Sequence, residues 1–241
     1  MLWQQSKSLS VFFALAVCVQ AALASNRCSA SIITGPATPV STLIANNGTV
    51  TSGDKLFSDF SYIFSGDMPG AAGVNVVPIT DDSGNYGIQF QGAFLDLPST
   101  QGGSDAKITY KVTVTDPNFL ISDAHMAGNP NLLGQFGSIS VTETFLPLGA
   151  NGEYTMEIYD DESLPTPKLT DVTFFNPKVR TLNVQKDILA FAAPGSQTAT
   201  LSWIDQSFSQ MRNEIPEPTT MMLSLLGMVG LIGAVRRRDR S

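Results

Sequence analysis

Histidine and cysteine are almost absent from this chain of 241 residues, which has one histidine, His125, and two cysteines, Cys18 and Cys28. A typical zinc site takes about four ligands, most of them His or Cys, so no such site is expected. No Gly-x-Gly-x-x-Gly motif opens a predicted helix, and no phosphate-binding loop is present. We therefore expect neither zinc nor nucleotide chemistry, and no cofactor.

Basic residues are scarce as well. The chain has 14 Lys and Arg against 21 Asp and Glu, which gives a net charge of −7. A surface with this balance repels the phosphate backbone of DNA and RNA. Nucleic acid is therefore excluded as a partner.

The first 24 residues predict a secretory signal peptide. Lys7 supplies the positive n-region, Leu9–Val19 the apolar core, and Ala22-Leu23-Ala24 a small-x-small cleavage signal. We expect cleavage after Ala24, which makes Ser25 the new N-terminus. The alternative, a buried helix of the folded body, is disfavoured, and the apolar core is too short for a stable membrane helix.

The C-terminal stretch from residue 215 to residue 241 has three parts. An extended motif, Pro216-Glu217-Pro218, is followed by an uncharged run over residues 219–235 and then by Arg236, Arg237 and Arg238. As a helix the run would span roughly 25 Å, slightly less than the ~30 Å hydrocarbon core of a bilayer. The arginines mark the cytoplasmic end of such a span. The alternatives are an ordinary C-terminal membrane anchor and, less consistent with the arginines, a buried helix.

This three-part tail resembles the PEP-CTERM sorting signal of Gram-negative bacterial surface proteins. The matching residues are Pro216, Glu217 and Pro218, the Gly- and Leu-rich span, and the terminal arginines. The resemblance implies recognition by exosortase, a membrane transpeptidase that cuts near the Pro-Glu-Pro motif. It also implies a transient single span in the inner membrane, followed by delivery to the cell surface or the extracellular matrix.

Without both terminal signals, roughly 190 residues remain, enough for one domain with a real core. They carry 9 basic and 20 acidic residues, so the exported body has a net charge near −11. Cys18 leaves with the leader and Cys28 is left without a partner in the same chain. No intramolecular disulfide is expected, despite the oxidising compartment.

Apolar and polar residues alternate along most of this body. Residues 107–114 place Ile108, Tyr110, Val112 and Val114 on one face, and Glu143 breaks a similar pattern of Ile139, Val141 and Phe145. Such alternation predicts half-buried antiparallel strands. The candidate strands are residues 56–64, 74–79, 86–95, 107–114, 139–145, 154–158, 171–175, 179–185, 188–192 and 199–204.

About ten short strands separated by Gly, Pro, Asn and Asp predict an all-β fold, an antiparallel β-sandwich of jelly-roll type. We expect the sandwich over residues 54–206. An irregular lead-in segment precedes it over residues 25–53, and a linker follows over residues 207–214. Residues 215–241 form the sorting tail, with one transmembrane helix over residues 219–235 and a basic end over residues 236–241.

Candidate catalytic residues are few. His125 could act as a base oriented by Asp123, since a strand would place both side chains on one face, but no nucleophile motif accompanies them. A glycoside hydrolase would need two carboxylates roughly 5 to 9 Å apart across a cleft. Asp96, Glu143, Glu157 and Asp160 are the candidates, although their sequence positions do not predict convergence. We expect no catalytic residue and a non-enzymatic body.

Two acidic clusters on predicted loops could bind Ca²⁺ weakly: Asp81 with Asp82, and Asp160 with Asp161 and Glu162. Neither has a calcium-loop spacing, so solvated turns are the preferred interpretation and no metal site is predicted. Phe60, Tyr62 and Phe64 share one strand face. Exposed rings there, or at Trp203, would form a platform for sugars, whereas buried rings would be core.

These observations favour an exported protein of the cell surface or extracellular matrix, with a structural or adhesive role in exopolysaccharide or biofilm. A carbohydrate-binding module is the alternative, with extracellular polysaccharide as the partner. A glycoside hydrolase-like enzyme is the weakest of the three hypotheses.

Overall fold

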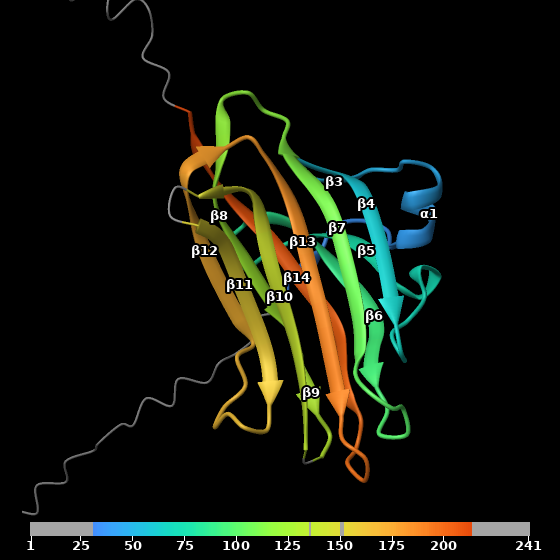
Figure 1. The fold of residues 1–241 in the computed structure, drawn as a ribbon. Coiled ribbons are helices and arrows are strands. Elements are labelled where there is room, and N and C mark those ends of the chain that lie inside the picture. Colours follow the sequence, from blue (N-terminus) through green and yellow to red (C-terminus); the bar gives the residue numbers. More distant parts are fainter. Residues whose placement is uncertain (1–30, 135, 150–151, 214–241) are drawn as a thin grey trace, which may run out of the picture.

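Two antiparallel β-sheets pack face to face in the computed structural model, which describes residues 31–134, 136–149 and 152–213 (Figure 1). The smaller sheet has six strands, in the order β11 (Gly152–Asp161), β10 (Gly137–Gly149), β13 (Thr181–Ala192), β7 (Ser104–Val114), β4 (Lys55–Ser65) and β3 (Val50–Ser52). The all-β sandwich predicted from the sequence is confirmed.

The larger sheet has eight strands. Six follow the order β1 (Ile32–Ile33), β5 (Asn75–Thr80), β6 (Tyr86–Asp96), β14 (Ala199–Arg212), β8 (Phe119–Gly128) and β12 (Thr170–Val179). Two short strands lie beside this row: β2 (Thr38–Pro39) pairs with β5, and β9 (Asn131–Leu132) pairs with β14. A helix α1 (Val40–Ala45) and a 3-10 helix η1 (Ala71–Gly73) complete the described elements.

The core lies between the two sheets and follows the period-two alternation of the strands. In β7, Ala106, Ile108, Tyr110 and Val112 are buried, while the residues between them face outward. Strand β13 alternates in the same way along its twelve residues. The alternation that predicted these strands is therefore the pattern that fills the core.

From β6 onward the chain crosses repeatedly between the two sheets, although β9 stays in the sheet of β8, and β10 and β11 are paired within the smaller sheet. Spatial neighbours β6-β14-β8-β12 in the larger sheet face β7-β13-β10-β11 in the smaller one. Strand β14, the last of the chain, therefore lies between β6 and β8, and β13 lies between β7 and β10. This arrangement places the C-terminal strands at the centre of both sheets.

Several predicted boundaries are wrong. The expected linker over residues 207–214 is strand as far as Arg212, because β14 continues between two neighbours. The predicted strands 179–185 and 188–192 are one strand, β13, and β8 was not predicted at all. Within the described part of the lead-in segment, short strands and α1 add to the sandwich, and Val40 and Leu43 join the core.

The predicted signal peptide with its cleavage point at Ala24 and Ser25, and the sorting tail from residue 215 to residue 241, lie outside the described residues. Neither helix of the described ranges has the length and apolar character that a membrane span requires.

Candidate functional site

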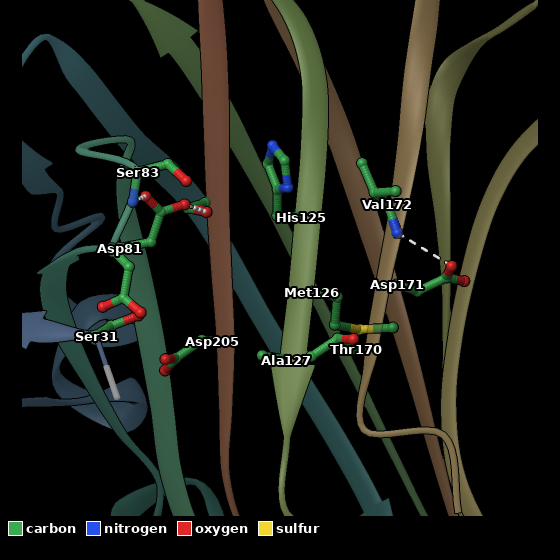
Figure 2. A pocket seen from close by; sticks show the side chains of 12 residues that line it. Ser31, Asp81, Ser83, His125, Met126, Ala127, Thr170, Asp171, Val172 and Asp205 are labelled. Atoms are coloured by element: carbon green, nitrogen blue, oxygen red, sulfur yellow. Dashed lines mark hydrogen bonds between the residues drawn. The ribbon is translucent and has the colours of Figure 1, made fainter. Parts of the chain in front are cut away.

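A polar groove of about 440 Å³ lies on the outer face of the larger sheet. We call it the outer-face groove; Figure 2 shows its side chains. Strands β14, β8 and β12 supply its floor, and the turn between β5 and β6 forms one wall. Its lining residues are Ser31, Asp81, Asp82, Ser83, His125, Met126, Ala127, Thr170, Asp171, Val172, Asp205 and Ser207.

Asp81 holds the turn between β5 and β6 against β14. Its Oδ1 accepts hydrogen bonds from the backbone N–H groups of Ser83 and Asn85, each at 2.9 Å. Its Oδ2 accepts bonds from Asn85 Nδ2 at 3.0 Å and from Ser207 Oγ at 2.5 Å. Burial disfavours the charge, but these bonds outweigh it and hold the pKa of Asp81 below its ordinary value.

Asp205 lies deeper on the same face and is 5% exposed. Gln89 on the neighbouring strand β6 donates to its Oδ1 at 2.6 Å. Burial raises the pKa of the Asp205 carboxyl. The hydrogen bonds from Ser31 and Gln89 lower this pKa and only partly offset the effect of burial. The sequence did not identify Asp205 as a buried site residue. A polar side chain on a strand is normally expected to face solvent, and nothing in the sequence indicates that other residues cover this face of β14.

His125 and Asp123 lie on the same outward face of β8, because they are two positions apart on a strand. His125 Nε2 lies 2.6 Å from Asp123 Oδ1 and 3.0 Å from Ser209 Oγ, which comes from the neighbouring strand β14. Ser122 also donates to Asp123, at 2.7 Å. The structure thus adds a serine that the sequence analysis did not associate with His125.

The three residues do not have the geometry of a hydrolytic triad. A triad uses both ring nitrogens, one to receive the proton of the serine and the other to donate to the carboxylate. Here the same nitrogen, Nε2, makes both contacts. The arrangement therefore cross-links β8 and β14 rather than preparing the serine for attack.

The four carboxylates considered for glycoside hydrolysis do not share one accessible cleft. Asp96 is fully buried and accepts hydrogen bonds from Ser104 Oγ at 2.6 Å and from the backbone of Ala192 at 2.7 Å. Glu143 is also fully buried. Glu157 is exposed, and Asp160 accepts a bond from the backbone of Leu132 at 2.8 Å.

The acidic loop clusters make turn hydrogen bonds. Asp81 is bonded as described above, and Asp161 Oδ1 accepts from the backbone and the hydroxyl of Ser163 at 2.7 and 2.6 Å. Asp161 and Glu162 also line a second hollow, of about 390 Å³, with Phe136 and Phe191. Among the described residues, no group of three or more His, Cys, Asp or Glu could hold a metal ion.

The predicted aromatic face of β4 belongs mainly to the core. Phe60 and Tyr62 are buried, and the Tyr62 hydroxyl donates to the carbonyl of Pro69 at 2.7 Å. Only Phe64, at the end of the strand, is exposed, and its ring stacks on Tyr62. Trp203 is half-buried in β14.

Phe174 is the exposed aromatic closest along the chain to the groove. It lies two residues from Val172 on the edge strand β12, and 69% of it is exposed. Its backbone pairs with Asp123 of β8, so it extends the outward face that carries His125. The sequence placed this residue on a strand but gave no means of telling which phase of the strand faced solvent.

Comparison with known proteins identifies the C-terminal segment. A family model described as the PEP-CTERM protein-sorting motif matches residues 214–238. The chain therefore carries a PEP-CTERM sorting motif. The motif implies recognition by exosortase, a membrane enzyme, and export through the membrane to the cell surface.

The body has no comparable assignment. No curated protein matches the chain. A solved structure of TmCBM61 in complex with β-1,4-galactotriose is similar over 63% of this chain and 88% of that one, with 12% identity and a TM-score of 0.31. A likeness at this level supports neither a fold nor a function for the body.

Proposed function

We propose that this chain is a surface or extracellular-matrix protein whose non-catalytic body has a structural or adhesive role in exopolysaccharide or biofilm. The sorting motif gives the destination. The observation that supports a body with no activity on an external substrate is that His125 and the buried Asp96 are engaged in hydrogen bonds that tie strands together. The strand order of the two sheets supports a jelly-roll topology for this body.

The proposed route to the surface uses both terminal segments. The signal peptide directs export and is cleaved after Ala24. Residues 219–235 then hold the protein in the inner membrane, with Arg236, Arg237 and Arg238 on the cytoplasmic side. Exosortase acts near Pro216, Glu217 and Pro218, and the sandwich is delivered to the surface.

Glycan binding in the outer-face groove is the second candidate function. The groove combines carboxylates, hydroxyls and an imidazole, all of which can hydrogen-bond sugar hydroxyls. Phe174 adds an exposed ring beside them, on which the apolar face of a sugar could stack. Together they make this groove the proposed contact with extracellular polysaccharide.

Retention of the purified protein on exopolysaccharide from the producing cells tests both proposals. We expect wild-type protein to be retained and Phe174→Ala to bind about fivefold more weakly, for a lost stacking contact of about 1 kcal/mol. Phe64→Ala removes another exposed ring and should bind like the wild type. Absence of retention would contradict the adhesive role, whereas equal retention of all three proteins would exclude the groove as the binding site.

A further inference from the structure

A lysine, a glutamine and a glutamate meet at the centre of the sandwich, far from solvent. Lys186 of β13 and Glu143 of β10 are cross-strand neighbours in the smaller sheet, and Gln206 reaches them from β14 of the larger sheet. All three residues are 0% exposed. Lys186 Nζ lies 2.5 Å from Glu143 Oε2 and 2.6 Å from Gln206 Oε1. The lysine thus contacts both other groups at once.

Apolar side chains pack around this cluster, and the Asp205 carboxyl group is a further charge that acts on Lys186. Met126 Sδ lies 3.6 Å from Lys186 Nζ. Phe145 and Phe208, each two residues along a strand from Glu143 or Gln206, pack edge-to-face with ring centroids 6.4 Å apart. A cluster enclosed in this way is protected from hydrolysis and from competition by water.

The cluster's hydrogen bonding is incomplete. Within the described part of the chain, Glu143 Oε1 and Gln206 Nε2 have no hydrogen-bond partner although both atoms are buried. Buried polar atoms are normally paired, and each exception calls for an explanation such as a reactive site. The unpaired Nε2 belongs to the amide group whose oxygen already contacts the lysine.

We propose that Lys186 and Gln206 become joined by an intramolecular isopeptide bond, formed by the folded chain itself with Glu143 as the catalytic residue. The contact to Oε1 places the amine beside Cδ, the carbon to which that oxygen is bonded. The unprotonated Nζ attacks Cδ, so that an Nζ–Cδ bond forms and the Cδ–Nε2 bond breaks. The neutral Glu143 carboxyl donates its proton to Nε2, which leaves as ammonia, and the resulting carboxylate accepts the proton that Nζ loses. No oxidant or co-reactant is needed.

Burial favours the protonation states that this step requires. Burial lowers the pKa of the Lys186 ammonium, although the Glu143 charge opposes the shift. Burial likewise raises the pKa of Glu143 to about 7, against the opposing effect of Lys186. A neutral amine beside a neutral carboxyl is therefore accessible near neutral pH, and only the neutral amine is nucleophilic.

A second buried lysine in the same sandwich provides a matched control. Lys55 of β4 is also 0% exposed and contacts the side-chain oxygen of Gln210 from β14, with Asp54 Oδ1 2.7 Å from its Nζ. The Asp54 side chain, unlike Glu143, is 20% exposed. Burial lowers the pKa of Lys55 as it does that of Lys186, but only the Lys186 cluster has a fully buried carboxyl group that is closed off from water. The bond is accordingly assigned to Lys186 and not to Lys55.

Mass spectrometry of the purified protein tests the assignment. Wild-type protein and Lys55→Met should each be lighter than the mass of their residues by one ammonia molecule, and tandem spectra of their proteolytic peptides should join Lys186 to Gln206. Lys186→Met and Glu143→Gln should have the full mass, with near-UV circular dichroism reporting whether each is folded. Comparing peptides makes the result independent of how the chain termini are processed.

The mass of the wild-type protein is by itself enough to contradict the proposal. The test therefore remains decisive even if a variant fails to fold. Folded wild-type protein with the full mass contradicts the bond. A loss of ammonia that persists in Lys186→Met and disappears in Lys55→Met would place the bond at Lys55 and contradict the proposal. A bond that forms normally in Glu143→Gln contradicts the role of Glu143. None of these outcomes depends on the proposed role in the extracellular matrix.

Discussion

At the residue scale, polar side chains in the interior and on the outer face of this sandwich form hydrogen bonds between segments that lie far apart along the chain. Asp96 joins the end of β6 to β7 and β13, His125 joins β8 to β14, and Asp81 joins the turn between β5 and β6 to β14. The residue types were visible in the sequence. Their partners were not, because each bond closes between strands far apart along the chain.

The hydrogen bonds of Asp81 predict that the free energy of unfolding depends on pH. Its folded-state pKa is lowered, so its contribution to stability is complete above the unfolded value near 4 and is lost as the pH falls through the folded value. Asp81→Asn loses charge-assisted bonds from Ser207 and Asn85 and should lower the free energy of unfolding by about 1–2 kcal/mol at neutral pH. The difference should shrink near pH 3, roughly one unit below the unfolded pKa.

Urea unfolding of wild-type and Asp81→Asn protein at both pH values measures this difference. Asp82→Asn, at the exposed neighbouring position, is the control and should behave like the wild type. A deficit of Asp81→Asn that is equal at both pH values would show that its carboxylate charge contributes nothing.

At the scale of the elements, the sequence best predicted the strands whose inward residues are mainly apolar. Strand β7 is the clearest case. Strand β13 was divided in two because Lys186, a charged residue, occupies an inward position between Val184 and Ile188. The end of β14 was taken for a linker because Asp205, Gln206 and Ser207 are polar, yet all three are buried.

Strand β8 was missed for a related reason. Its inward residues include the small Ala124 and Gly128, and its outward residues Asp123 and His125 hydrogen-bond to each other. Neither face therefore gives a strong alternation signal. Sequence periodicity identifies strands by apolar burial and fails where polar groups are buried in pairs.

The pairing of β6 with β14 depends on the absence of a side chain at Gly87. A Cβ at this position would lie 2.0 Å from the carbonyl oxygen of Gln206, so the two strands would have to separate. Gly87→Ala should therefore destabilise the fold by about 1–3 kcal/mol, the cost of overpacking. Gly73→Ala is the control, since its nearest neighbour would be a proline side-chain atom at 3.4 Å.

Thermal unfolding of the two glycine variants measures the effect. A melting temperature of Gly87→Ala equal to that of Gly73→Ala would contradict the close approach of β6 and β14.

At the scale of the whole molecule, the sequence located the function better than the structure of the body does. The sorting motif occupies a short C-terminal segment outside the described residues, and it is recognisable from residue types and their order. The outer-face groove could not be predicted, because it combines residues from the turn between β5 and β6 and from β8, β12 and β14 that only the topology brings together.

We expect the chain to be sorted at its tail and the sandwich to act outside the inner membrane. The most direct test is the mass of the mature protein recovered from the cell envelope and from the medium. We expect a form that lacks residues 1–24 and the residues after about Pro218, and we expect Glu217→Ala to keep its tail. A wild-type protein that retains Arg236–Arg238 would contradict the account and place the body at the inner membrane.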